Sequence, residues 1–247
     1  MGTAFDGQVA VVTGGTQGIG RATVQALLAV GATVASLDIT PAAHSETMSI
    51  ACDVREPDEI ARAFDLVQRD LGPVTLLVNN AGVNAYFDAA SMATHEWDAF
   101  FSLDLRAAWL CTKAALPGML AAGHGAIVNV ASIHANLTTP GMFPYAAAKA
   151  GMLGLTRSLA LDFGPRGVRV NAVCPGWVRT AAVERQLAMA ADPDTAFQQV
   201  LAQQPSGRMA EPGEIAAVIR FLLSDEASYI NAAAIPVDGG LGAQVHA

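Results

Sequence analysis

Cysteine and basic side chains are both scarce in this sequence. Three cysteines occur in 247 residues, Cys52, Cys111 and Cys174, and none belongs to a Cys-x-x-Cys pair. An odd number of widely spaced cysteines argues against a disulfide framework and a thiolate metal site, and it favours a reducing compartment. The 14 lysines and arginines face 22 acidic residues, which gives a net charge of −8, and they form no cluster. Such a chain is a poor partner for nucleic acid or an anionic membrane.

Long hydrophobic runs and metal-binding patterns are missing as well. No apolar stretch is long enough to span a bilayer, and no basic segment precedes the short apolar run at 9–12, which therefore does not read as a signal peptide. The start Met1-Gly2 would suit N-myristoylation, but Asp6 breaks that pattern. The five histidines form neither a HxxxH nor a HExxH pattern, which leaves no case for a metal. We therefore expect a cytoplasmic protein without a membrane or metal partner.

What the sequence does contain is apolar material in an alternating order. Apolar residues make up 52% of the chain, and charged residues only 15%. Short β-rich runs alternate with longer helical segments. Strands are expected at 9–12, 33–37, 49–52, 74–78, 126–130, 168–173 and 233–237, and helices at 18–30, 57–71, 97–120, 143–163 and 211–223. This order predicts an α/β fold, a Rossmann-like doubly wound parallel sheet of about seven strands with helices on both faces. No linker or repeat divides the chain, so we expect one domain over 1–247.

The alternation breaks at 177–208, a stretch rich in Ala, Gln and Met. An insert of this size after the carboxyl end of a strand is a candidate substrate lid, which we place at 177–210. The alternative is a peripheral pair of helices.

A glycine-rich loop, Thr-Gly-Gly-Thr-Gln-Gly-Ile-Gly at 13–20, joins the first expected strand to the first expected helix. Its glycines let the backbone turn sharply and approach a pyrophosphate, while the helix N-terminus offers free N–H groups. The spacing is GxxxGxG rather than the GxGxxG of the usual fingerprint, and glycine-rich turns also serve packing. The candidate cofactor-binding residues of this loop are Gly14, Thr16, Gln17, Gly18, Ile19 and Gly20.

Asp38 closes the second expected strand, 18 residues after Gly20. A carboxylate at this point can accept hydrogen bonds from the ribose hydroxyls of an adenosine, and it repels a 2′-phosphate. Its neighbours Gln17 and Ile39 carry no positive charge. The sequence therefore favours NAD over NADP, the alternative being that Asp38 is a turn residue before Pro41.

Tyr145 and Lys149 stand four residues apart on an expected helix, so their side chains share one face. The chain has only three tyrosines and two lysines, which makes the pairing informative. An ammonium beside a phenol favours the phenolate, and Tyr145 could then remove a hydroxyl proton while hydride leaves for a nicotinamide. Ser132 follows an expected strand at the sheet edge where ligands bind, and its hydroxyl can hold the substrate oxygen. A half-buried tyrosine with a solvated lysine is the alternative.

These motifs resemble those of the short-chain dehydrogenase/reductase family, in its short single-domain branch, along nearly the whole chain. The loop at 13–20 is similar to the family's TGxxxGIG, 79–82 to NNAG, 171–176 to NxxxPG and 237–240 to VDGG, while Tyr145 and Lys149 form YxxxK with Ser132 at the expected spacing. The resemblance implies that these three residues are catalytic and that Tyr145 and Lys149 also bind the cofactor. It implies further cofactor contacts from Asp53, Val54, Asn80, Ala81, Gly82, Pro175, Gly176, Val178 and Thr180.

Two positions depart from the family pattern. Asp104 replaces the fourth catalytic residue, an asparagine thought to hold a water that links the lysine to solvent. Asp accepts that hydrogen bond but cannot donate one as an amide does, and its charge partly offsets that of Lys149. We hypothesise an alkaline optimum suited to oxidation, the alternative being that Asp104 substitutes without effect. Ala232, where the family often has glycine, is expected to affect packing only.

Polar and aromatic side chains follow several of these motifs. Hydrogen-bonding groups in a cleft favour a hydroxylated small molecule over a bare hydrocarbon, and the surrounding stretches are similar to family members that oxidise sugars or polyols. Any of these residues could instead be an ordinary loop residue. The candidate substrate contacts are Asn84, Tyr86, His134, Asn136 and Trp177.

Expected helices near 107–120 and 145–163 are apolar around most of their circumference and need a partner besides their own sheet. We expect a homo-oligomer, with a tetramer favoured because the family is usually tetrameric or dimeric. The leading interpretation is an NAD-dependent enzyme that interconverts an alcohol and a carbonyl. The alternatives are an NADP-linked ketoacyl-type reductase, against which Asp38 argues, and a catalytically weak NAD-binding regulatory protein, which Asp104 keeps open.

Overall fold

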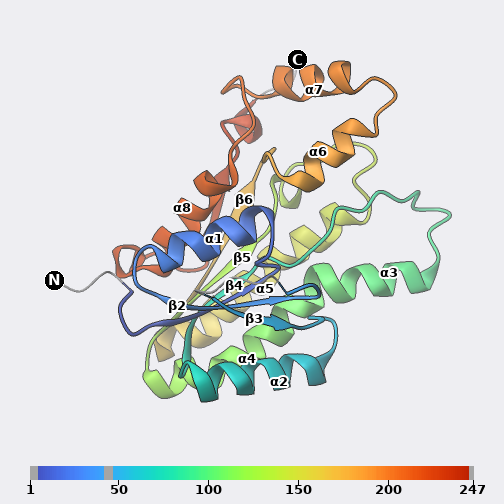
Figure 1. Cartoon of the computed structure of the whole chain (residues 1–247). Coiled ribbons are helices and arrows are strands. Elements are labelled where there is room, and N and C mark those ends of the chain that lie inside the picture. The colour runs from blue at the N-terminus through green and yellow to red at the C-terminus, as the bar shows by residue number, and fades with distance from the viewer. Residues whose placement is uncertain (1–4, 42–46, 245–247) are drawn as a thin grey trace.

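A computed structural model describes residues 5–41 and 47–244 of the chain (Figure 1). At its centre, seven strands form one sheet in the order β3-β2-β1-β4-β5-β6-β7, and all neighbours pair in parallel. The order reverses between β1 and β4, which in open α/β sheets opens a crevice at the carboxyl ends of the strands. The strands are β1 Val9–Thr13, β2 Thr33–Asp38, β3 Met48–Ala51, β4 Val74–Asn79, β5 Gly125–Val130, β6 Val168–Pro175 and β7 Ala234–Val237.

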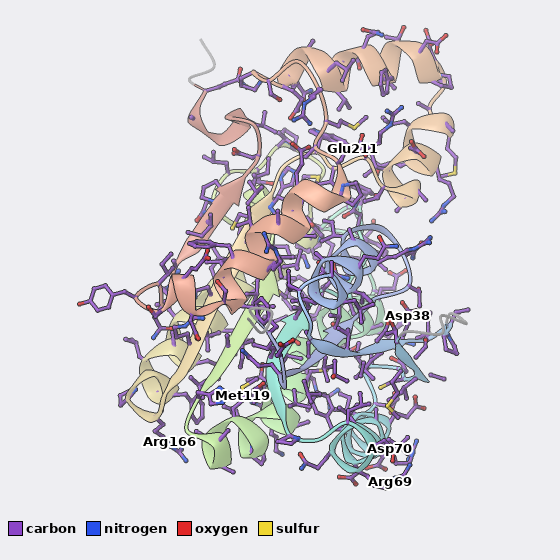
Figure 2. All side chains as sticks on the ribbon, turned by 60° about the vertical axis from the view of Figure 1, so that its left-hand side comes forward. Asp38, Arg69, Asp70, Met119, Arg166 and Glu211 are labelled. Carbon is purple, nitrogen blue, oxygen red and sulfur yellow. The ribbon has the colours of Figure 1, made fainter. Side chains whose placement is uncertain are left out.

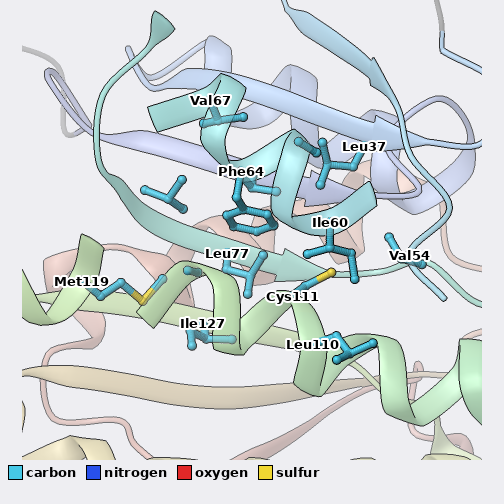
Figure 3. Packing of buried hydrophobic residues seen from close by; sticks show 14 of the residues in the cluster. Leu37, Val54, Ile60, Phe64, Val67, Leu77, Leu110, Cys111, Met119 and Ile127 are labelled. Atoms are coloured by element: carbon cyan, nitrogen blue, oxygen red, sulfur yellow. The ribbon is translucent and has the colours of Figure 1, made fainter. Parts of the chain in front are cut away.

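Helices cover both faces of the sheet, and each face has its own apolar core. Helices α1 (Gly18–Leu28) and α8 (Pro212–Leu223) pack on one face, whereas α2 (Pro57–Asp70), α4 (Ala107–Ala122) and α5 (Tyr145–Phe163) pack on the other. Successive side chains of a strand point to opposite faces. Figure 3 shows the second of these cores, where Phe64 of α2 and Cys111 of α4 close over Leu77 of β4.

Strand β1 shows why its run is apolar without alternation. Val9 and Val11 belong to the core under α2 and α4, while Ala10 and Val12 belong to the core under α1 and α8. Because both faces of the sheet are covered, Val9 to Val12 are all buried, and the one polar residue of the strand is Thr13 at its carboxyl end. The seven strands and the doubly wound parallel sheet expected from the sequence are confirmed.

The prediction of one continuous helix over 97–120 is wrong. Instead of a single helix over 97–120, the chain forms α3 (Thr94–Phe101), a π-helical turn η1 (Ser102–Arg106) and then α4. The π turn widens the backbone ring, so that the N–H of Ala107 reaches the carbonyl of Ser102. Such turns cluster at functional sites, and this one contains Asp104.

The expectation for Ala232 is also corrected. Its φ is +60°, and it is a non-glycine residue in the left-handed region. The effect of alanine here is therefore on the backbone and not on packing alone. The conformation is held by the loop before β7, where Asn231 Oδ1 accepts the N–H of Val170 (2.9 Å) and Ala232 N–H donates to the Val170 carbonyl (2.9 Å).

The segment 177–210 forms two helices, α6 (Ala181–Ala188) and α7 (Pro193–Gln203), that stand beyond the strand ends at the top of Figure 1. Both ends of this excursion meet, because Val178 and Ala210 form a parallel bridge and Ala210 N–H donates to the Trp177 carbonyl (2.9 Å). The three cysteines are free and buried. Within the described ranges, no helix is long and apolar enough to cross a bilayer.

Candidate active site

One large cleft opens at the carboxyl ends of the strands, with a volume of about 820 Å³. Nearly all site residues expected from the sequence line it, from the glycine loop at one end to the substrate candidates at the other. Three do not: Thr16 and Gly20 support the loop from behind, and Asn136 lies exposed beyond η2 (Ile133–Ala135). The substrate candidates Asn84, Tyr86, His134 and Trp177 all face this cleft.

The glycine loop has the shape that a close-approaching phosphate needs. Gly14 has φ +64°, and a Cβ on Gly20 would lie 2.0 Å from the Gly14 carbonyl oxygen, so side chains are excluded there. The side chain of Asn80 donates to the carbonyls of Thr13 and Gly14 (3.0 Å each), which ties the loop to the end of β4. No side chain caps the N-terminus of α1, and its first N–H groups remain free for an anion. These features fit a dinucleotide pyrophosphate.

Asp38 lies at the end of β2 (Figure 2). Its carboxylate is held in place by Thr16. The Thr16 hydroxyl donates to Oδ2 (2.6 Å), the Thr16 N–H approaches the same oxygen (3.3 Å), and the N–H of Thr40 donates to Oδ1 (3.2 Å). The carboxylate is thus oriented at the rim of the cleft, at the point where the ribose of an adenosine would lie.

Asp53 and Arg55 form an ion pair at the same end of the cleft. Arg55 donates to both oxygens of Asp53, with Nη2–Oδ2 at 2.5 Å and Nε–Oδ1 at 2.9 Å. These hydrogen bonds from Arg55 hold the pKa of Asp53 below its usual value. Arg55 was missed by the sequence reasoning. Its guanidinium is bound by Asp53, and no described residue forms an ion pair with Asp38.

Tyr145, Lys149 and Ser132 come together on one wall. Tyr145 opens α5 and Lys149 follows one turn later, with its Nζ 5.5 Å from the centroid of the Tyr145 ring. Ser132 follows β5, and its Oγ accepts the N–H of His134 (3.2 Å), which leaves the hydroxyl proton for a ligand. The imidazole of His134 packs edge-on against Tyr145, with ring centroids 6.1 Å apart, and burial lowers the pKa of His134.

Asp104 completes this wall from behind. Its Oδ1 lies 3.3 Å from Lys149 Nζ, and both of its oxygens accept the N–H of Val83 (3.2 Å each). Burial raises the pKa of Asp104, while Lys149 and the N–H of Val83 oppose that shift. Lys149 also donates to the carbonyl of Val130 (3.4 Å). The arrangement can support proton exchange at the phenol of Tyr145. Its neighbouring ammonium, Lys149, is itself paired with the buried carboxylate of Asp104.

The far side of the cleft is formed by α6. The hydroxyl of Tyr86 donates to Oε1 of Gln186 (3.3 Å), which joins the loop after β4 to this helix. Arg185 and Met189 of the same helix also line the cleft. Sequence reasoning did not single out these helix residues, although it placed their segment over the site.

Comparison with known proteins agrees with this geometry. The family model described as Enoyl-(Acyl carrier protein) reductase matches residues 14–242. The chain is 37% identical to 2-(S)-hydroxypropyl-CoM dehydrogenase 3 of Xanthobacter autotrophicus, over 98% of this chain and 100% of that protein. It is 34% identical to the 3-oxoacyl-acyl-carrier-protein reductase FabG of Thermotoga maritima, over 96% and 98%. The solved structure of Thermoplasma acidophilum aldohexose dehydrogenase superimposes with a TM-score of 0.94 at 32% identity, covering 100% of this chain and 98% of that one. The chain belongs to the short-chain dehydrogenase/reductase family, whose enzymes use a nicotinamide cofactor to act on alcohol or carbonyl substrates.

Proposed function

We propose that the protein is an NAD-dependent dehydrogenase that interconverts a secondary alcohol, such as a sugar or polyol hydroxyl, and the corresponding carbonyl. The observation that carries this proposal is that Tyr145, Ser132 and Lys149 share one cleft with the glycine loop and Asp38. A phenol, a hydroxyl and an ammonium at one end, and a pyrophosphate cradle at the other, are the groups that hydride transfer to a nicotinamide needs.

In the mechanism, a bound nicotinamide supplies the acceptor for the hydride. Ser132 donates a hydrogen bond to the substrate oxygen, because its Oγ already accepts from His134 and its proton is free. Tyr145 takes the hydroxyl proton during oxidation and returns it during reduction. Lys149 stabilises the phenolate, and it is held for this task by the Val130 carbonyl and by Asp104. Asp104 thus acts through Lys149 rather than on the substrate.

The preference for NAD is supported by the surroundings of Asp38. Its carboxylate accepts from Thr16 and Thr40 and faces the cleft, where it can accept hydrogen bonds from the hydroxyls of a ribose. A 2′-phosphate would meet this negative charge, and the neighbouring Ile39 supplies no cation to offset it. The ketoacyl-type alternative is the activity of the Thermotoga relative, and the carboxylate of Asp38 is the feature that argues against its NADP-linked form.

A hydroxylated substrate is supported by the polar character of the far end of the cleft. Asn84, Tyr86, His134 and Trp177 each offer a hydrogen-bonding group among the residues that line the cleft, and His134 packs against Tyr145. A site built from such groups rejects analogues that cannot pair with them. The similarity to an aldohexose dehydrogenase is in line with this choice.

The segment 177–210 is proposed to act as the substrate lid. Its two ends meet at the bridge between Val178 and Ala210, so helices α6 and α7 can move as one flap about that point. The contact between Tyr86 and Gln186 is then part of the closed arrangement.

We further propose a homo-oligomer, with a tetramer favoured, in the cytoplasm. A groove of about 640 Å³ runs between α4 and α5; its apolar lining is Phe101, Leu105, Trp109, Gly151 and Leu155, and Asp98, Ser102 and Arg106 also border it. Trp109 is 44% exposed there, which is costly for a large apolar side chain in a lone chain. Three free thiols suit a reducing compartment.

The test is the formation of NADH, followed by its absorbance, across a panel of aldoses, polyols, secondary alcohols and hydroxy acids. We expect NAD-dependent turnover that Tyr145→Phe abolishes, because a ring without its hydroxyl cannot exchange a proton. Tyr229→Phe is the matched control: it removes the phenol of a tyrosine that is fully exposed outside the cleft, and we expect turnover to be unchanged. Absence of turnover on every compound, or turnover that Tyr145→Phe leaves intact, would refute the proposal.

A further inference from the structure

Of the arginine and lysine side chains that line the cleft, all but one have a carboxylate partner among the described residues. Arg55 binds Asp53 (2.5 Å) and Lys149 binds Asp104 (3.3 Å). Arg185 of α6 lines the same cleft, and none of the described residues gives it a carboxylate partner.

The neighbours of Arg185 on its own helix do not neutralise it. Residues three and four positions away on a helix are the ones that can pair, and here they are Ala181, Ala182, Ala188 and Met189. The adjacent Glu184 points elsewhere, because its Oε1 binds Arg179 Nε (3.2 Å). The guanidinium therefore has no carboxylate partner on its own helix, and it borders the cleft.

The position of Arg185 separates it from the part of α6 that faces the glycine loop. Thr180 caps the start of the helix and lies against Gly18, where a Cβ would be 3.2 Å from Thr180 Cγ2. Arg185 follows five residues later, about 7.5 Å along the helix axis. Its neighbour Gln186 is bound to Tyr86 at the substrate end. The arginine thus stands beside the substrate end of the cleft rather than at the pyrophosphate cradle.

From this arrangement we infer that the substrate carries an oxyanion, a carboxylate or a group of similar shape, which Arg185 binds while Tyr145 and Ser132 hold the carbinol. A guanidinium is the side chain best suited to two parallel hydrogen bonds with such a group. The substrate class is then a hydroxy acid and its product an oxo acid. This inference rests on the proposed function, because it assigns a ligand to the same site.

Calorimetric binding tests the inference without turnover. The protein is saturated with whichever of NAD⁺ and NADP⁺ it binds, and it is then titrated with 4-oxopentanoate or with 2-pentanone, which has a methyl group in place of the carboxylate. We expect the oxo acid to bind at least about tenfold more tightly than the ketone, a difference of about 1.4 kcal/mol. Arg185→Gln should remove this advantage, and Arg185→Lys should retain part of it because the charge remains.

Arg179→Gln is the matched control, since it removes an arginine that is on the same segment but is bound to Glu184 outside the cleft lining. It should leave the ratio between acid and ketone unchanged. The inference is overturned if wild type binds the two compounds equally or binds neither, or if Arg185→Gln keeps the ratio. It is also overturned if Arg185→Gln weakens the binding of the dinucleotide itself, because the oxyanion would then be a cofactor phosphate. The proposed function fails separately, through the loss of all Tyr145-dependent turnover.

Discussion

The carboxylate of Asp104 lies 3.3 Å from the ammonium of Lys149, and both side chains are buried. Burial of a charge is costly unless it is paired and hydrogen-bonded, and here the carboxylate is compensated by Lys149 and the N–H of Val83. The pairing also changes what Lys149 can do for Tyr145. An ammonium that shares its charge with a carboxylate stabilises a phenolate less than an ammonium beside a neutral amide does.

Asp104→Asn is therefore expected to move the rising limb of the pH–rate profile for alcohol oxidation to lower pH by about one unit, equivalent to about 1.4 kcal/mol. The ionisable groups around the reacting centre are Tyr145, Lys149 and His134, and the variant changes only the charge behind Lys149. The measurement is kcat against pH at saturating substrate and cofactor.

Asp65→Asn serves as the control for this charge change, because Asp65 is exposed on α2 and lines neither the catalytic cleft nor the groove between α4 and α5. Its profile should match that of wild type. An unchanged profile for Asp104→Asn would show that the carboxylate substitutes for the amide without electrostatic effect.

The fold could be predicted from the sequence more completely than the wall of the site around Asp104. Alternating apolar runs depend on local patterning, so β1 to β7 and the doubly wound sheet could be predicted. The π turn around Asp104 could not be predicted. The same sequence could equally form an α-helical hydrogen bond from the Ala107 N–H to the Leu103 carbonyl in place of the observed bond to the Ser102 carbonyl. Tertiary packing decides between the two.

The same reason explains other features that sequence patterns do not reveal. Val83 contacts Asp104 through a backbone N–H, and a backbone group has no residue type to recognise. Arg185 became notable only when Arg55 and Lys149, which also line the cleft, were seen to have carboxylate partners. Ala232 was a visible departure, but its φ of +60° depends on how the loop closes onto β6.

Cofactor choice should respond to the charge at the end of β2. The double variant Asp38→Asn with Ile39→Arg removes the carboxylate and places a cation on a side chain that is 72% exposed at the cleft. We expect the ratio of kcat/KM for NADP to that for NAD to rise by about a hundredfold or more, or about 2.7 kcal/mol. Ile39→Gln is the control and should leave NAD preferred. If wild type already uses both cofactors equally, the role assigned to Asp38 is wrong.

Ala232→Gly is expected to stabilise the protein by about 0.5–1 kcal/mol. An L-residue in the left-handed region costs about 1–2 kcal/mol, which glycine avoids. Part of this gain is lost because glycine has more conformational freedom in the unfolded chain. Urea unfolding followed by circular dichroism measures the change. Ala233→Gly, one residue later and outside the left-handed region, should lower the free energy of unfolding instead. Equal effects of the two substitutions would contradict the backbone explanation.

The three cysteines should resist a thiol reagent in the folded protein although one of them borders the cofactor cleft. Burial, aided by Glu59 and Asp53, raises the pKa of Cys52 to about 11, and burial raises the pKa of Cys174 to about 11 as well. Burial also raises the pKa of Cys111. Because only the thiolate reacts, labelling with a chromogenic disulfide at pH about 8 should be slower than in urea by about a hundredfold or more.

Cys52 makes this labelling a test of the adenosine end of the cleft. Its side chain lines the cleft but is only 2% exposed, so saturating dinucleotide should add little further protection. Rapid labelling of one thiol that disappears in Cys52→Ser, and that NAD suppresses, would mean that the wall formed by Cys52 and Asp53 opens when the site is empty. Slow labelling of all three thiols, unaffected by NAD, is the result that a closed and preformed adenosine wall predicts.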